Sequence, residues 1–167
     1  MPLSASTLSD GLTRAFKKTF DTVKGSVDGS PPNIPKVVAD ELAAAYDGYV
    51  TSGSPKAGAL SIVIPGIPAS LGSAMVAPMM AGWFPGLVAY WTPVIWTGPG
   101  FIPINPTIPA ALSGIAPEIS KFLAGGSHSL EESADKISEI LHKYTTQLMV
   151  TATTVPPASV VTIVPVS

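Results

Sequence analysis

Residues 57–117 read AGALSIVIPGIPASLGSAMVAPMMAGWFPGLVAYWTPVIWTGPGFIPINPTIPAALSGIAP, and these 61 residues contain no Asp, Glu, Lys or Arg. Ten of the eighteen prolines of the chain lie in this stretch. All three tryptophans lie there too: Trp83, Trp91 and Trp96. Every charged side chain is therefore in one of the flanks, residues 1–56 or 118–167. An uncharged run of this length is expected to be covered by protein or by lipid.

The length of the uncharged centre would permit two membrane spans of about 20 residues each. Leu60–Phe84 and Pro85–Ile104 are the two candidates. Proline argues against such spans, because each one inside a helix removes a hydrogen bond and costs about 3 kcal/mol. Lipid cannot satisfy the polar groups that are left. We therefore expect a packed segment, while a re-entrant arrangement or one covered by a partner stays open.

Within the centre, the sequence predicts short elements separated by proline and glycine. Leu60–Ile64 is rich in β-branched residues and predicts a strand. Pro68–Gly82 predicts a short helix kinked at Pro78, and Trp83–Ile104 predicts an irregular or polyproline-like segment. Thr107 is the predicted cap of a further helix that ends at Gly125-Gly126.

Six aromatic residues gather in the segment that we expect to be irregular. Such a cluster is typical of a binding interface, where aromatic residues often provide most of the affinity. It is equally typical of an ordinary core, and the sequence leaves both alternatives open. The six candidate interface residues are Trp83, Phe84, Tyr90, Trp91, Trp96 and Phe101.

The amino-terminal flank, residues 1–56, predicts a helical hairpin. Apolar residues recur at helical spacing in the first helix: Leu8, Leu12, Phe16, Phe20 and Val23. Its four basic residues indicate either a solvated back face or a surface for an anionic membrane or a partner. Asn33 is the expected cap of the second helix, with Pro35 in its first turn.

The carboxy-terminal flank, residues 118–167, predicts a helix followed by two strands. Ser129 and Glu132 form the pattern of a capping box at the helix start. The β-branched runs after Met149 and Ser159 indicate strands that pair with each other or with a neighbouring subunit. We thus predict one domain over residues 1–167, with a mainly helical α+β fold, an irregular apolar centre and a small carboxy-terminal β part.

Composition excludes several classes of function. Charged residues make up 12% of the chain, about half the usual share for soluble domains. The mean hydropathy is +0.41 and the net charge is −2, so we expect no nucleic-acid partner. With no cysteine and only two histidines, we predict no metal, no cofactor and no catalytic residues. Glu139 and His142 have the spacing of a di-iron motif, but a second copy is absent, and we expect His142 to be solvated.

Three segments resemble small structural proteins of tailed bacteriophages and related contractile particles. They are the helical start LTRAFKKTF at 12–20, the segment LAAAYDGYV at 42–50, and the Thr/Val-rich end from Met149. The resemblance implies a virion or particle component, made in the cytoplasm without a signal peptide. It implies no functional residue.

The sequence therefore predicts a non-enzymatic structural or assembly protein that packs through its apolar centre against itself or its neighbours. We expect other protein subunits as partners, in a homo-oligomer or a larger assembly, because the apolar surface exceeds what one chain can cover. The alternative is a membrane-associated, holin-like or pore-forming protein.

Overall fold

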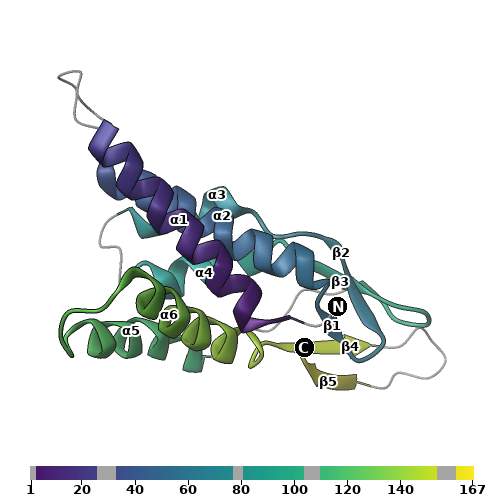
Figure 1. Cartoon of the computed structure of the whole chain (residues 1–167). Coiled ribbons are helices and arrows are strands. Elements are labelled where there is room, and N and C mark those ends of the chain that lie inside the picture. Colours follow the sequence, from purple (N-terminus) through teal and green to yellow (C-terminus); the bar gives the residue numbers. More distant parts are fainter. Residues whose placement is uncertain (1–2, 26–32, 77–80, 104–109, 154–160) are drawn as a thin grey trace.

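The computed structural model describes residues 3–25, 33–76, 81–103, 110–153 and 161–167 (Figure 1). Helices provide most of the described structure, so the predicted mainly helical α+β fold is confirmed. The elements, in chain order, are α1 Ala5–Gly25, α2 Ile34–Gly53, β1 Lys56–Ala57, β2 Leu60–Ile64, α3 Pro68–Met75, α4 Trp83–Trp91, β3 Ile95–Thr97, the 3-10 helix η1 Ala110–Gly114, α5 Ile115–Leu123, α6 Leu130–Thr145, β4 Met149–Thr153 and β5 Val161–Pro165.

Helices α1 and α2 form the predicted hairpin, which projects from the rest of the molecule (Figure 1). Asn33 caps α2 by accepting a hydrogen bond from the backbone N–H of Lys36, and Pro35 lies in the first turn as predicted. Helix α1 packs against α2 and α6 through a buried face that consists of Leu8, Leu12, Ala15 and Thr19.

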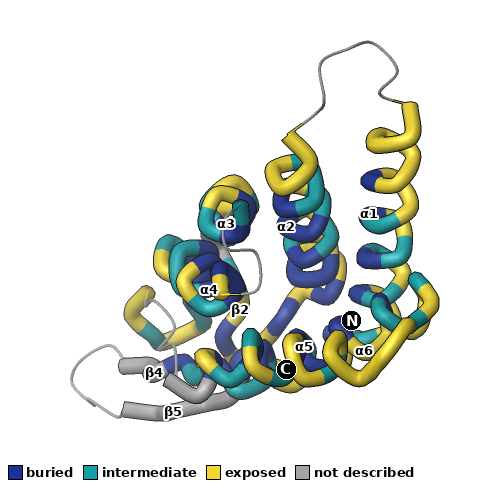
Figure 2. The backbone as a smooth tube through the Cα atoms, turned by 90° about the vertical axis from the view of Figure 1, so that its left-hand side faces the viewer, coloured by how far each residue is buried: buried dark blue, intermediate teal, exposed yellow. Residues whose placement is uncertain are grey.

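The remaining helices enclose the aromatic residues of the uncharged centre. Helix α3 packs on α2, α4 packs on α3, and α5 packs on α6, as Figure 2 also shows. The predicted capping box at the start of α6 is confirmed: Ser129 Oγ accepts from the Glu132 N–H, and Glu132 Oε2 accepts from the Ser129 N–H. The buried apolar side chains form a cluster that draws on both flanks and the centre.

Two small antiparallel sheets lie at the other end of the molecule from the hairpin tip (Figure 1). One has the order β1-β2-β3, and the other pairs β4 with β5 within the chain, as one of our two alternatives predicted. The end of the chain joins the two sheets. Lys56 N–H donates to Ser167 O over 3.1 Å, and Ser167 N–H donates to Lys56 O over 2.9 Å.

The prediction of an irregular segment at Trp83–Ile104 was wrong, because the described part of it contains α4 and β3. Pro85 is the third residue of α4, where the missing N–H would have no partner inside the helix. Pro117 has the same place in α5, and Pro68 begins α3. These prolines therefore belong to first helical turns and do not interrupt helices.

The predicted helix Pro68–Gly82 is shorter than expected, because α3 ends at Met75. The expected kink at Pro78 and the expected cap at Thr107 lie outside the described residues. Across the described ranges, none of the helices is both long enough and apolar enough to span a bilayer.

Candidate functional site

The structure places the six aromatic candidates at two depths. Trp83, Tyr90, Trp91 and Trp96 are at most 1% exposed within the single chain. Phe84 and Phe101 are half-buried and pack against the same core. Four of the six are therefore covered almost completely within the chain, and the two phenylalanines keep more exposed surface.

A chain of buried hydrogen bonds orders this aromatic core. Trp91 Nε1 donates to Tyr46 Oη over 3.0 Å, and Tyr46 Oη lies 2.8 Å from Thr145 Oγ1. Thr145 Oγ1 donates to Leu141 O over 2.8 Å. Because each hydroxyl has one proton, Tyr46 must donate to Thr145. This network could not be predicted from the sequence, because Tyr46 is 45 residues from Trp91 and 99 residues from Thr145.

Two further tyrosines direct their hydroxyls to polar partners at the edge of the core. Tyr90 Oη donates to Asp47 Oδ1 over 2.7 Å, and Tyr49 Oη lies 2.7 Å from His142 Nδ1. Burial raises the pKa of Tyr46 to about 12 and raises the pKa of Tyr49 and of Tyr90 further above the usual value.

Burial also lowers the pKa of His142, which is half-buried. The expectation that His142 is solvated was therefore wrong, since its ring meets Tyr49 edge-on at 6.0 Å between centroids. The lowered pKa favours the neutral imidazole of His142 in this contact with Tyr49. These groups hold α2, α4 and α6 together.

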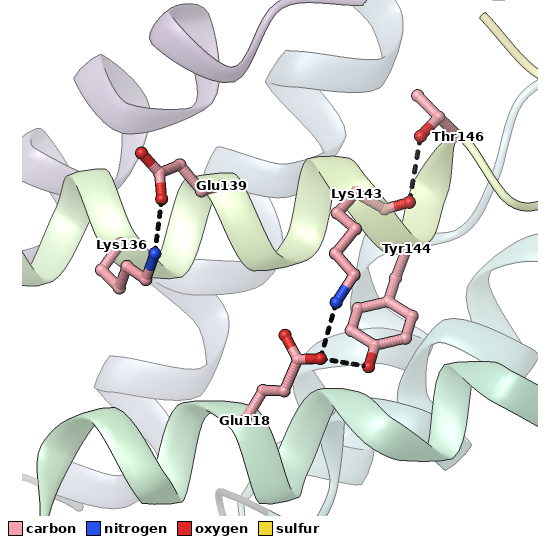
Figure 3. Close-up of polar contacts among 6 residues, drawn as sticks. All are labelled: Glu118, Lys136, Glu139, Lys143, Tyr144 and Thr146. Carbon is pink, nitrogen blue, oxygen red and sulfur yellow. Dashed lines mark hydrogen bonds and ion pairs between the residues drawn. The ribbon is translucent and has the colours of Figure 1, made fainter.

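A charged groove of about 650 Å³ lies between α5 and α6. Lys143 Nζ and Tyr144 Oη both donate to Glu118 Oε1, over 2.6 and 2.8 Å, and Lys136 pairs with Glu139 (Figure 3). The hydrogen bond from Lys143 is the main reason that the pKa of Glu118 is lowered. The contacts of Glu118 with Lys143 and Tyr144 therefore dock α5 on α6, whereas Lys136 and Glu139 pair within α6.

A second groove, of about 330 Å³, is almost entirely apolar. We call it the apolar groove. Five helices, α1, α2, α4, α5 and α6, contribute to it, and one residue of its lining is polar. The lining residues are Phe16, Val38, Leu42, Trp83, Leu123, Leu130, Ser133 and Ile137.

The predicted apolar stripe of α1 extends beyond the part of the molecule that covers it. Leu8 and Leu12 are fully buried and Phe16 is half-buried, but Phe20 is 65% exposed and Val23 is 40% exposed. Ile34, at the start of α2, is 41% exposed. We call Phe20, Val23 and Ile34 the apolar tip, and Figure 2 shows that this end of the hairpin is exposed.

The apolar stripe of α1 was predictable from the sequence, but the apolar groove was not. The groove brings together residues from both flanks and the centre, and no local spacing signals such a meeting. Within the described part of the chain, no group of three or more His, Cys, Asp or Glu side chains is placed to hold a metal ion.

No protein-family model, curated protein or solved structure matches this chain. The apolar groove and the apolar tip are therefore the features from which a function can be argued.

Proposed function

We propose that this protein is a non-enzymatic structural or assembly subunit that packs against other protein subunits, as a component of a bacteriophage virion or a related particle made in the cytoplasm. The observation that supports the proposal is the apolar tip, with Phe20 65% exposed, beside a groove that is almost entirely apolar. The assignment to a virion follows the sequence resemblance alone.

Burial energetics favour an occupied tip. Removing apolar surface from water contributes about 25 cal/mol per Å², and a phenylalanine that becomes fully covered gains about 1.5–3 kcal/mol. Exposed apolar residues that adjoin an apolar groove are typical of a contact site. The apolar tip and the apolar groove adjoin, because Phe16 lines the groove one helical turn before Phe20.

The proposed contact differs from the one that the sequence suggested. We expected the aromatic centre to meet the partner, but most of those side chains already meet each other inside the chain. In the present proposal the centre serves as the core and the amino-terminal hairpin makes the contact. Phe84 and Phe101, which are half-buried, remain candidates for a lesser share of it.

Gel filtration with mass detection tests this proposal, in buffer with and without a non-ionic detergent. We expect assemblies heavier than the 17.1 kDa chain without detergent. Detergent should reduce their mass, because it covers the apolar tip. A detergent-free, monodisperse monomer at tens of micromolar would contradict the proposal.

A membrane-surface role is the second candidate, and one observation favours it. Lys24 lies in the last turn of α1 next to the exposed Val23 and Phe20, a pairing that is typical of helices that lie on anionic lipid. Flotation with vesicles of phosphatidylcholine and phosphatidylserine separates the candidates. Binding that depends on Phe20 would support the membrane role, whereas protein that stays at the bottom of the gradient would exclude it.

A further inference from the structure

We propose that a second copy of this chain covers the apolar tip, in a two-fold dimer where Phe20 of each copy enters the apolar groove of the other. This inference rests on the proposed assembly function and names its partner. It also assigns roles to the two features: the tip is the inserted part and the groove is the receptor.

The insert and the receptor lie on the same face of the hairpin. On α1, the residue lining the groove is Phe16, and Phe20 follows one turn later toward the tip. On α2, which runs the other way, Val38 lines the groove and Ile34 lies one turn nearer the tip. Both helices thus continue the apolar lining of the groove outward.

A two-fold axis turns this arrangement into a closed pair. In such a dimer the same patch is used on both copies. The two-fold rotation therefore places Phe20 of each copy in the apolar groove of the other. The hairpins then run antiparallel, and each copy makes the contact twice. The groove has a volume of about 330 Å³ and an almost entirely apolar lining, which suits an aromatic side chain.

The charges around the two features are complementary. The first turn of α6, which borders the groove at Leu130 and Ser133, carries Glu131 and Glu132. Glu131 lies 3.5 Å from Lys17 of its own chain, so two carboxylates and one lysine leave this region acidic. The end of α1 carries Lys24, which forms no ion pair with any residue in the described ranges. In the antiparallel pair, Lys24 approaches Glu131 of the second copy, and opposite charges there fix the register.

The same charges disfavour lipid as the occupant. Two of the basic residues of α1 are already paired, Lys17 with Glu131 and Lys18 with Glu41. The acidic start of α6 beside the groove would repel an anionic surface. An anionic bilayer would therefore meet both acidic and basic side chains around the apolar tip and the apolar groove. A second copy instead places Glu131 opposite Lys24 and Lys24 opposite Glu131.

Cysteine cross-linking tests the register directly, because the natural chain contains no cysteine. The variants Lys24→Cys and Glu131→Cys are mixed, with a mass tag on one of them, and then oxidised. We expect the mixed disulfide dimer to form in preference to either dimer of one variant. Lys56→Cys is the matched control, because this exposed lysine lies among the sheets, away from the tip, and should give no mixed dimer with either variant.

A second test measures the dissociation constant of the dimer. Phe20→Ser should raise it about 30-fold or more, as expected of an interface hot spot. Ile102→Ser is the matched control: Ile102 is 45% exposed but lies outside the apolar tip, so the constant should change less than about twofold. Circular dichroism checks that both variants fold.

Three outcomes would overturn the inference, and each has a separate meaning. Self-association that survives Phe20→Ser, without the mixed disulfide, places the interface elsewhere and leaves the proposed assembly function standing. A monomer at every concentration contradicts both proposals. Flotation with phosphatidylserine-containing vesicles that Phe20→Ser abolishes, without any dimer, identifies lipid as the occupant of the tip.

Discussion

Tyr46→Phe removes one oxygen atom from the fully buried centre of the core. Tyr46 Oη accepts a hydrogen bond from Trp91 Nε1 over 3.0 Å and donates one to Thr145 Oγ1 over 2.8 Å. Phenylalanine fills nearly the same space, so the change leaves no large cavity. Its main effect is that the indole N–H of Trp91, which is 0% exposed, loses its acceptor.

The expected cost follows from that unsatisfied donor. A buried polar group without a partner costs about 1–3 kcal/mol, and Tyr46→Phe should lower the free energy of unfolding by that amount. For a chain of this size, this corresponds to about 2–12 °C in melting temperature. In the described part of the chain Trp96 Nε1 is already a buried donor without a partner, so the core would contain a second one.

Urea unfolding followed by tryptophan fluorescence measures the change. Tyr144→Phe is the matched control, because the Glu118 carboxylate that its hydroxyl contacts keeps Lys143 as a partner. We expect a cost of about 0.5 kcal/mol or less there. Thr145→Val should cost less in the Tyr46→Phe background than in the natural chain, because the two hydroxyls form one bond. A Tyr46→Phe protein as stable as the natural one, or equal effects of Thr145→Val in both backgrounds, would refute the network.

Three further predictions concern stability. The pKa values of Tyr46, Tyr49 and Tyr90 are raised in the folded protein, so their contribution to stability is fully present below their unfolded pKa near 10. It is lost as the pH rises above 10, by up to about 1.4 kcal/mol per pH unit for each tyrosine. A urea midpoint that stays constant from pH 9 to about 11 would contradict the burial of these hydroxyls. Ser129→Ala should cost about 1 kcal/mol through loss of the α6 cap, and unchanged thermal unfolding would show that the capping box contributes nothing. Leu141→Ala should cost about 2–5 kcal/mol because this side chain is 0% exposed, and an unchanged melting temperature would mean that α6 presents another face to the core.

The elements that local chemistry defines were predictable from the sequence. The cap at Asn33, the capping box at Ser129 and the strand at Leu60–Ile64 each depend on residues within a few positions. The prolines of the centre were harder to interpret. A proline costs a helix hydrogen bond in the interior but nothing in the first turn, and Pro85 alone does not reveal which turn it occupies.

The candidate site was less predictable than the fold. The stripe of α1 indicated which side of the helix is apolar. How far along α1 this side is buried depends on where α6 packs against it, and the sequence does not show that position. The groove likewise needs residues as distant as Phe16 and Ile137 to meet. Aromatic composition drew attention to the centre, although burial within the chain explains most of those residues equally well.

Sedimentation equilibrium of the natural chain and of Phe20→Ser, without detergent and over a range of concentrations, measures whether the apolar tip is an assembly contact. For the proposed dimer, the natural chain should approach twice its mass of 17.1 kDa as its concentration rises, while Phe20→Ser should stay near the single mass over the same range. A mass of 17.1 kDa for both proteins at every concentration, or equal association of both, would contradict the claim that the apolar tip is an assembly contact.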